Sequence, residues 1–320
     1  NYNVFVIDKQ FNENSSISLI NTNVTRNGHF RDANVTAALF NITNKANKYN
    51  IQGQAKMSNV NTQDGNISGF SSQFSVGKVS EKYQYSIGHR LADKKYDIND
   101  LGLQLRNNFS NYFVNVSYRI FEPTKNLNNL SIRFSANYNM LYKPNVYTGN
   151  FFSLNVFAQT KKLFAFGGNI FALLGKQFDY FEPRTEGRYA AFKNFVNTRA
   201  FISTDFNKKY AISIRIGLGT LFEKERDLFN YSIRIAPRIK FNENFIMNYS
   251  FRFNESKGRR GFVTKTGDDT IFGQRNQETI TNSISGSYNF DSYNAITLTV
   301  RNFWTTVNYE HNLFLLEENG

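Results

Sequence analysis

The sequence contains no cysteine, which excludes disulfide scaffolds and thiolate zinc sites. Proline is scarce, at four residues, and Trp304 is the only tryptophan. No stretch approaches the roughly 18 uninterrupted apolar residues that a membrane-spanning helix needs. Together with the mean hydropathy of −0.49, this excludes a polytopic helical membrane protein. Glycine-rich phosphate loops and HExxH or CxxC motifs are also absent.

Aromatic residues are abundant instead, with 33 Phe and 18 Tyr among 320 residues. This content excludes a disordered chain. The net charge of +13 and the pI of about 9.7 are compatible with a nucleic-acid-binding protein. However, the basic residues are scattered singly and form neither a basic helix nor an RNA-binding sheet signature. An AT-rich genome accounts for the many Asn and Lys residues, and we expect no nucleic-acid partner.

Apolar and polar residues alternate with a period of two along nearly the whole chain, as in Tyr112–Ile120, Tyr210–Leu218 and Phe245–Phe253. About sixteen such segments of roughly 9–13 residues occur, and one is predicted at Leu101–Leu105. Strands of soluble sandwiches average about 5–6 residues, whereas transmembrane barrel strands are near 10. The sequence therefore predicts an all-β fold, an antiparallel transmembrane β-barrel of about sixteen or more strands.

The expected connections alternate between short turns and long loops in the second half of the chain, which is typical of outer-membrane barrels. The short turns are predicted at Gln159–Lys162, Asn207–Lys209, Asn242–Asn244 and Asp291–Asn294. The long loops are predicted at Glu182–Gly187, Glu223–Phe229 and Glu255–Asp269. The last residues, from Leu315 to Gly320, read as a loop, so we expect one barrel domain over residues 1–320 that lacks closing strands and is truncated at both ends.

Arginine recurs in the non-apolar register of successive segments. If the apolar face meets lipid, these side chains point into the lumen, because an arginine at the lipid midplane costs roughly 2–4 kcal/mol. They could form a positive lumen that favours anions, or pair with acidic loops or partners and have no transport role. Both readings stay open. The nine residues are Arg90, Arg106, Arg119, Arg133, Arg215, Arg234, Arg238, Arg252 and Arg301.

Several ordered segments carry a resemblance to a known family. They are Asn21–Arg26, Asp32–Val35, Tyr96–Gly102, Phe178–Arg184, Ile271–Arg275 and Arg301–Trp304. The chain resembles, over nearly its whole length, the C-terminal barrel domain of unknown function in outer-membrane proteins of Bacteroidota. In that family the barrel follows a β-sandwich similar to carbohydrate-binding modules of family nine. The resemblance implies a barrel in the bacterial outer membrane. If glycan binding belongs to the sandwich, it cannot be carried over to these residues.

Candidates for other chemistry are few. His29, His89 and His311 have no Ser or Asp at a spacing typical of a catalytic nucleophile and its base, so we expect that the protein is not an enzyme. Asp97 and Asp100 could bind Ca²⁺, but an Asx turn is the simpler interpretation, and we expect no metal and no cofactor. Contacts with a partner or glycan are candidates at the loops. These residues are Asp179, Glu182, Arg184, Arg188, Arg259 and Arg260, the last two in a basic loop able to meet lipopolysaccharide phosphates.

The function expected from the sequence is a channel or gated pore with an Arg-rich lumen for small polar or anionic solutes. The alternative is a non-conducting barrel platform, or a subunit of a larger outer-membrane secretion, uptake or assembly complex. A soluble β-rich adhesin is a third reading. The expected partners are outer-membrane lipids and lipopolysaccharide, and other outer-membrane subunits or surface lipoproteins.

Overall fold

A computed structural model describes residues 1–28, 31–223 and 226–320 of the chain. Within these ranges every regular element is a β-strand, as the period-two pattern predicts. None of the described segments forms a helix long and apolar enough to span a membrane. The strands are β1 Tyr2–Phe11, β2 Ser15–Val24, β3 Arg31–Thr43, β4 Tyr49–Thr62, β5 Gly65–Lys78, β6 Tyr83–Ala92, β7 Phe109–Ile120, β8 Leu127–Met140, β9 Tyr147–Thr160, β10 Ala165–Asp179, β11 Ala190–Ser203, β12 Tyr210–Leu221, β13 Phe229–Lys240, β14 Phe245–Thr266, β15 Asp269–Asn289 and β16 Ala295–Leu315.

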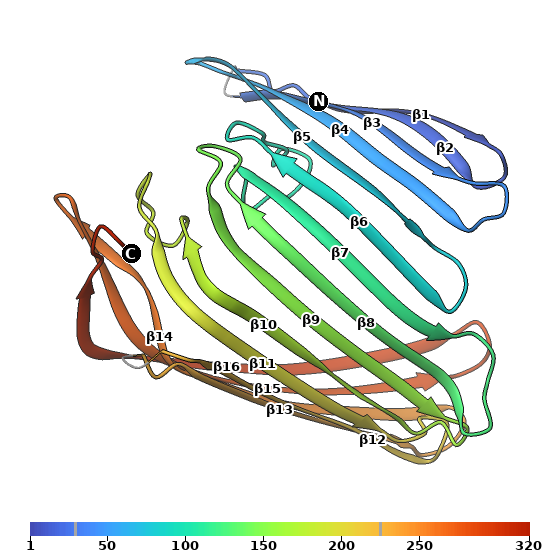
Figure 1. Cartoon of the computed structure of the whole chain (residues 1–320). Coiled ribbons are helices and arrows are strands. Elements are labelled where there is room, and N and C mark those ends of the chain that lie inside the picture. The colour runs from blue at the N-terminus through green and yellow to red at the C-terminus, as the bar shows by residue number, and fades with distance from the viewer. Residues whose placement is uncertain (29–30, 224–225) are drawn as a thin grey trace. The chain divides into compact units, whose positions relative to one another are not determined.

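The sixteen strands form one antiparallel sheet in which each strand pairs with its neighbours in the sequence (Figure 1). The structure confirms the predicted all-β class, the antiparallel pairing and the number of about sixteen strands. Hairpin connections explain this order, because antiparallel strands can be joined by turns of a few residues without crossovers.

The chain forms two compact units. Unit 1 comprises Asn1–Tyr118 and Phe134–Asn150, and unit 2 comprises Arg119–Arg133 and Phe151–Gly320. Unit 1 contains β1 to β6 and most of β7, and unit 2 contains β10 to β16. The prediction of a single domain over residues 1–320 stays a prediction.

In unit 1, the polar face of the sheet carries a small buried cluster of Val24, Ala33 and Val60, which lie opposite one another on β2, β3 and β4. The residues that connect β6 to β7, 93–108, fold onto this face. Tyr96 is only 3% exposed, and the backbone N–H of Asp97 donates to Ser58 Oγ on β4 (3.0 Å). Burial raises the pKa of the Tyr96 phenol to about 12. We call residues 93–108 the inner loop.

The inner loop corrects one prediction from the sequence, because the alternating segment Leu101–Leu105 is not a strand. Asn99 accepts a hydrogen bond from Gln104 N (2.7 Å) and closes a turn, and Leu103 and Leu105 are 78% and 85% exposed. The expected Asx turn is present, since Asp97 accepts from Asn99 N (2.9 Å). Five alternating residues are too few to resist such local side-chain bonding.

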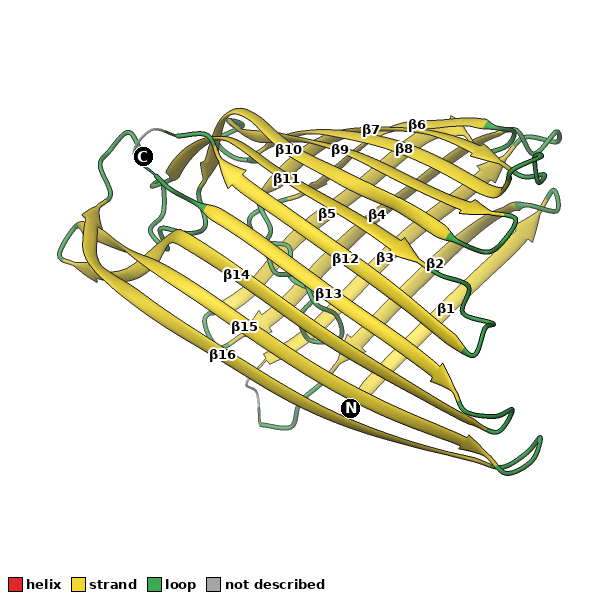
Figure 2. Ribbon diagram, turned by 90° about the horizontal axis from the view of Figure 1, so that it is seen from below, coloured by secondary structure: helices red, strands yellow, loops and turns green. Residues whose placement is uncertain are grey.

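In unit 2, β10 to β16 lie side by side, and β14, β15 and β16 are the longest strands (Figure 2). The long loop predicted at Glu255–Asp269 is wrong, because β14 continues to Thr266 and β15 begins at Asp269. Two register shifts interrupt this hairpin, after Ser256 and after Phe262. Gly258 takes a positive φ of 67° at the first shift. A β-bulge adds an unpaired residue and interrupts the period-two alternation of apolar and polar residues. The sequence of this part of β14 therefore resembles that of a loop.

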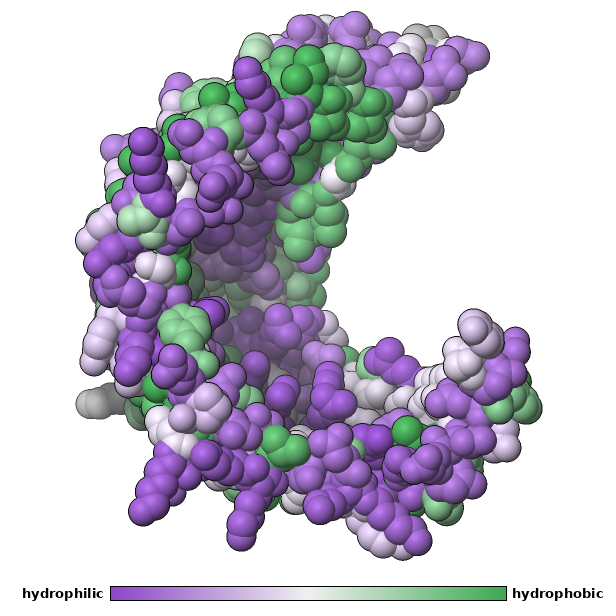
Figure 3. Space-filling model, turned by 90° about the vertical axis from the view of Figure 1, so that its right-hand side faces the viewer, coloured by the Kyte–Doolittle hydropathy of each residue, from purple (hydrophilic) through white to green (hydrophobic). Residues whose placement is uncertain are grey.

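The apolar face of the strands is open to the surroundings in both units. Examples are Ile87 on β6 of unit 1 and Ile216 on β12 of unit 2, which are 55% and 50% exposed. Trp304 lies on this face too, in the middle of β16. Figure 3 views the strand ends that carry the short turns, which are mostly hydrophilic. Exposed apolar faces of this extent mark contact with a membrane or another protein.

Candidate functional site

Three arginines lie directly opposite one another on the polar face of unit 2. Arg215 of β12 pairs with Arg234 of β13, and Arg234 pairs with Arg252 of β14. We call these residues the arginine row. The alternation of side chains along a strand places them on the face opposite Ile216, Ile233 and their apolar neighbours.

None of the arginine row forms a salt bridge with a described residue. Arg234 Nε donates to Ser250 Oγ (3.1 Å), and the Arg215 guanidinium lies 5.8 Å from the ring centre of Phe201. Like charges directly opposite in a sheet are destabilising, because the two side chains approach within a few ångströms. The arrangement is therefore electrostatically unfavourable unless anions or water screen it.

A cavity of about 540 Å³ lies beside the arginine row. Arg133 of β8, Arg199 of β11 and Arg215 line it, together with Asn155 and Asn169. Among the described residues, Arg133 and Arg199 also lack a salt-bridge partner. The lining therefore offers three guanidiniums and two amides, which are groups that bind anions in other proteins.

The structure places eight of the nine predicted arginines on strands. Arg106 is the exception, because it lies in the inner loop rather than on a strand. Arg90 lies between Gln73 and Asn111, and Arg301 lies opposite Ser283. Arg238 donates to the carbonyl oxygen of Phe206. The eight are Arg90, Arg119, Arg133, Arg215, Arg234, Arg238, Arg252 and Arg301.

Two further arginines, Arg26 and Arg31, are paired in unit 1. Both contact the Asp100 carboxylate, at 2.8 Å and 2.9 Å, and Arg31 also contacts Asp97 at 2.8 Å. Burial by itself would raise the pKa of the Asp100 carboxyl. The hydrogen bonds and charges of Arg31 and Arg26 outweigh it and lower the pKa below its ordinary value. These aspartates thus hold the inner loop against the strands.

The loop contact candidates come together at one end of unit 2. Glu182 accepts from the backbone N–H of Phe262 (3.1 Å), and Arg184 lies 4.7 Å from the ring centre of Phe262. Arg188 donates to the carbonyl oxygens of Leu316 and of Glu317. The loop after β10 is therefore attached to β14 and to the residues after β16.

The remaining three candidates lie around a second, larger cavity of about 1190 Å³ that Glu182 also lines. Asp179 ends β10 and accepts hydrogen bonds from Phe181 N and Glu182 N. Arg259 and Arg260 lie on β14 rather than in a basic loop. Whether any of these side chains contacts a partner stays a prediction.

The described residues contain no cluster of three or more His, Cys, Asp or Glu able to hold a metal ion. His89 Nε2 is 2.8 Å from Ser110 Oγ, and the ring packs on Tyr112 at 4.5 Å between centres. His29 lies outside the described residues. The described geometry contains no acid positioned to activate His89.

Sequence reasoning missed two cavity residues, Arg199 and Arg226. Arg199 is on β11, where Asn197, Arg199 and Phe201 share the polar face but the apolar alternation is weakened by Thr198 and Ala200. Applying the period-two alternation to this strand despite its weak apolar face would have identified Arg199. Arg226 lies between β12 and β13 in a predicted loop, and no signal in the sequence indicates that its Nε atom is buried.

The chain was compared with curated proteins, solved structures and protein families. No curated protein and no solved structure matches the chain. One family model matches residues 1–320, and its description is a domain of unknown function, DUF5916. The all-β chain with the arginine row on its polar face is therefore a member of the DUF5916 family.

Proposed function

We propose that this domain is a β-barrel of the bacterial outer membrane whose polar face lines a pore for small anionic or polar solutes. The observation that carries the proposal is the arginine row, three guanidiniums in register with no acidic partner among the described residues. Rings of unpaired cationic side chains favour anions in channels.

The apolar face supports the membrane location. Tyr210, Ile216 and Leu218 of β12 are each at least half exposed in unit 2, and Tyr83 and Ile87 of β6 are so in unit 1. In a bilayer these side chains would contact lipid. A closed barrel is the one sheet architecture that satisfies its backbone hydrogen bonds there. The resemblance to Bacteroidota barrel domains that follow a family-nine-like sandwich points to the same compartment.

A planar-bilayer recording with a salt gradient tests the proposal. Folded protein is expected to give steady conductance with a reversal potential that favours chloride over potassium, because the arginines concentrate anions in the pore. Folding is checked by heat-modifiable migration on a denaturing gel. Silent membranes with folded protein, or a reversal potential that favours cations, would contradict the proposal.

One observation favours the platform as a second candidate. The inner loop covers part of the polar face of unit 1, where Arg26 and Arg31 hold it through Asp97 and Asp100. A filled lumen would suit a barrel that anchors surface domains or assembles with other outer-membrane subunits. Copurification with stoichiometric partners in mild detergent is the expected result for a platform, and a lone conducting barrel would contradict it.

A further inference from the structure

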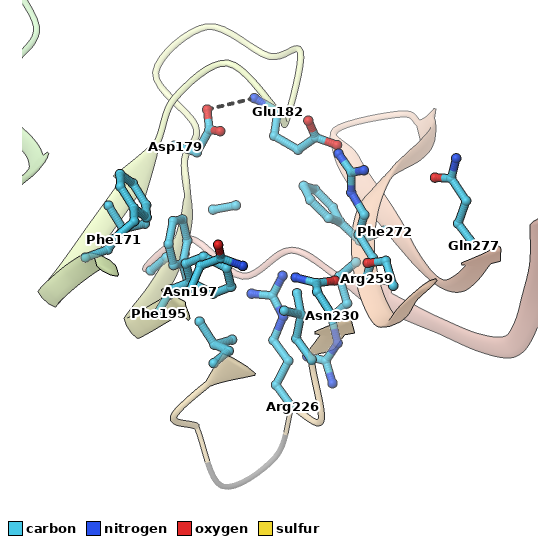
Figure 4. A pocket seen from close by; sticks show the side chains of 18 of the residues that line it. Phe171, Asp179, Glu182, Phe195, Asn197, Arg226, Asn230, Arg259, Phe272 and Gln277 are labelled. Carbon is cyan, nitrogen blue, oxygen red and sulfur yellow. Dashed lines mark hydrogen bonds between the residues drawn. The ribbon is translucent and has the colours of Figure 1, made fainter. Parts of the chain in front are cut away.

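The larger cavity of unit 2 lies on the same polar face as the arginine row, and its lining extends to the loop after β10 and the end of β16. Its volume of about 1190 Å³ is ample for a small organic ligand, since pockets of that kind usually measure about 300–1,000 Å³. Figure 4 shows Phe171 and Phe195 on one side and Phe272 on the other, with Arg226 extending between them.

Arg226 is the central polar group of this cavity. Its Nε atom is buried and has no hydrogen-bond partner among the described residues. Burial lowers the pKa of the guanidinium, and the charge of Arg260 lowers it further, although Glu223 acts in the opposite direction. An unsatisfied buried donor on a charged group is destabilising, so a ligand that accepts a hydrogen bond from it would relieve that cost.

Three more guanidiniums border the same space, those of Arg199, Arg259 and Arg260. Arg259 has no salt-bridge partner among the described residues. Arg260 donates from Nε to Gln274 Oε1 (3.1 Å) and stacks on Phe314 at 3.8 Å from the ring centre. Four guanidiniums, those of Arg199, Arg226, Arg259 and Arg260, therefore line the cavity.

Of the four acids that line the cavity, three are engaged with other groups, and the fourth, Glu317, is exposed after β16. Asp179 Oδ1 accepts from two backbone N–H groups, and Glu182 Oε1 accepts from Phe262 N. Glu255 forms a salt bridge with Lys257 at 3.3 Å. These contacts leave Arg226 and Arg259 without acidic partners among the described residues.

We propose that this cavity binds a small soluble organic anion, with a carboxylate or phosphate on Arg226 and Arg259 and an apolar body between Phe195 and Phe272. Asn230 supports a ligand with a further polar group, because its buried Oδ1 has no hydrogen-bond partner in the described part of the chain. Charged hydrogen bonds would orient the anion, and aromatic walls would supply the apolar contact.

Isothermal titration of the whole folded chain in neutral detergent tests the proposal with phenyl phosphate, benzoate, inorganic phosphate and benzyl alcohol. Phenyl phosphate and benzoate are expected to bind, benzyl alcohol to show no binding, and inorganic phosphate to bind at least about tenfold more weakly than phenyl phosphate. Equal affinity for the two phosphates would overturn the apolar part of the site. Binding of benzyl alcohol as tightly as of phenyl phosphate would overturn the anionic part.

The variants R226Q and R259Q are each expected to weaken phenyl phosphate binding by about tenfold or more, because a charge-assisted hydrogen bond is lost. R259Q alters an exposed side chain, so it keeps the test informative if R226Q fails to fold. The matched control is K162Q in the exposed turn after β9, which removes one charge and is expected to leave the affinity unchanged. Equal loss in all three variants would overturn the site. A silent bilayer would not, because the binding test needs no conduction.

Discussion

In unit 1, Arg26 and Arg31 share the carboxylate of Asp100, whereas in unit 2 the guanidiniums of the arginine row face one another across adjacent strands. Lys48 and Lys78 of unit 1 are paired in the same way, both on Glu81 at 2.7 and 2.6 Å. The same residue type thus appears in two electrostatic settings within one chain.

The difference separates arginines that hold the fold from arginines available to a ligand. A guanidinium bonded to a nearly buried carboxylate is neutralised and fixes a loop, so its loss is expected to affect stability. A guanidinium without an acidic partner contributes little to stability or opposes it, but its charge is free to attract a solute anion. The predictions below test this division, beginning with the largest expected effect.

Replacing Gly69 with alanine is expected to lower the free energy of unfolding by about 3 kcal/mol, because a Cβ there would collide with the backbone of Lys95 and Tyr96 in the inner loop. Chemical unfolding in detergent measures the change. The control is Gly286→Ala on β15, where a Cβ meets only ordinary contacts with Phe245. An equal cost in the two variants would show that the inner loop does not pack on β5.

Asp100→Asn is expected to lower the free energy of unfolding by about 2 kcal/mol, because Arg26 and Arg31 lose their shared charge partner. The Asp100 side chain is 7% exposed, but both arginines are about one-third exposed, so solvent reduces the cost below that of a fully buried pair. The same unfolding measurement applies, with Asp64→Asn in the exposed turn after β4 as the control. A loss no larger than that of Asp64→Asn would mean that the pairing is not structural.

The attachment of the inner loop is expected to weaken in acid. The pKa of the Asp97 carboxyl is also lowered: burial would raise it, but Arg31 and the Asn99 hydrogen bonds outweigh burial. A folded-state pKa below the unfolded value gives stability that is present above about pH 4 and is lost as the pH falls through the folded pKa. Tryptic cleavage at Lys94 and Lys95 after brief acid exposure should therefore rise below about pH 4 in the wild type. Asp100→Asn should flatten that rise, and an unchanged pH profile in the variant would count against the mechanism.

Arg234→Gln is expected to raise the free energy of unfolding by about 0.5 kcal/mol, the opposite sign to Asp100→Asn. It removes the central charge of the arginine row and retains a donor for Ser250. Parallel unfolding curves of this variant and the wild type measure the effect. A clear loss of stability would place Arg234 among the structural arginines and break the comparison.

The strands could be predicted from the sequence, because apolar and polar residues alternate over about ten residues in each of them. The errors occurred where local bonding or bulges interrupt the period of two. Asn99 closes a turn within the apparent strand at Leu101–Leu105, and the bulge at Gly258 makes the continuation of β14 read as a loop. Neither event leaves a pattern in the apolar residues.

The sequence predicted which face of the sheet carries the arginines of the row, but not that they lie directly opposite one another without acidic partners. Alternation places Arg215, Arg234 and Arg252 on the polar face, whereas their register and their lack of acidic partners follow from strand pairing that the sequence does not specify. The role of Arg226 could not be predicted from the sequence, because the burial of its Nε atom depends on strands and loops from distant parts of the chain.

The most direct test of the central claim is the reversal potential of R215Q/R234Q/R252Q, compared with the wild type under the same salt gradient. The control is a triple variant of exposed turn lysines, K161Q/K162Q/K209Q, which removes the same charge. We expect the arginine variant to lose most of its preference for anions and the control to keep it. A reversal potential unchanged in the arginine variant would contradict the account.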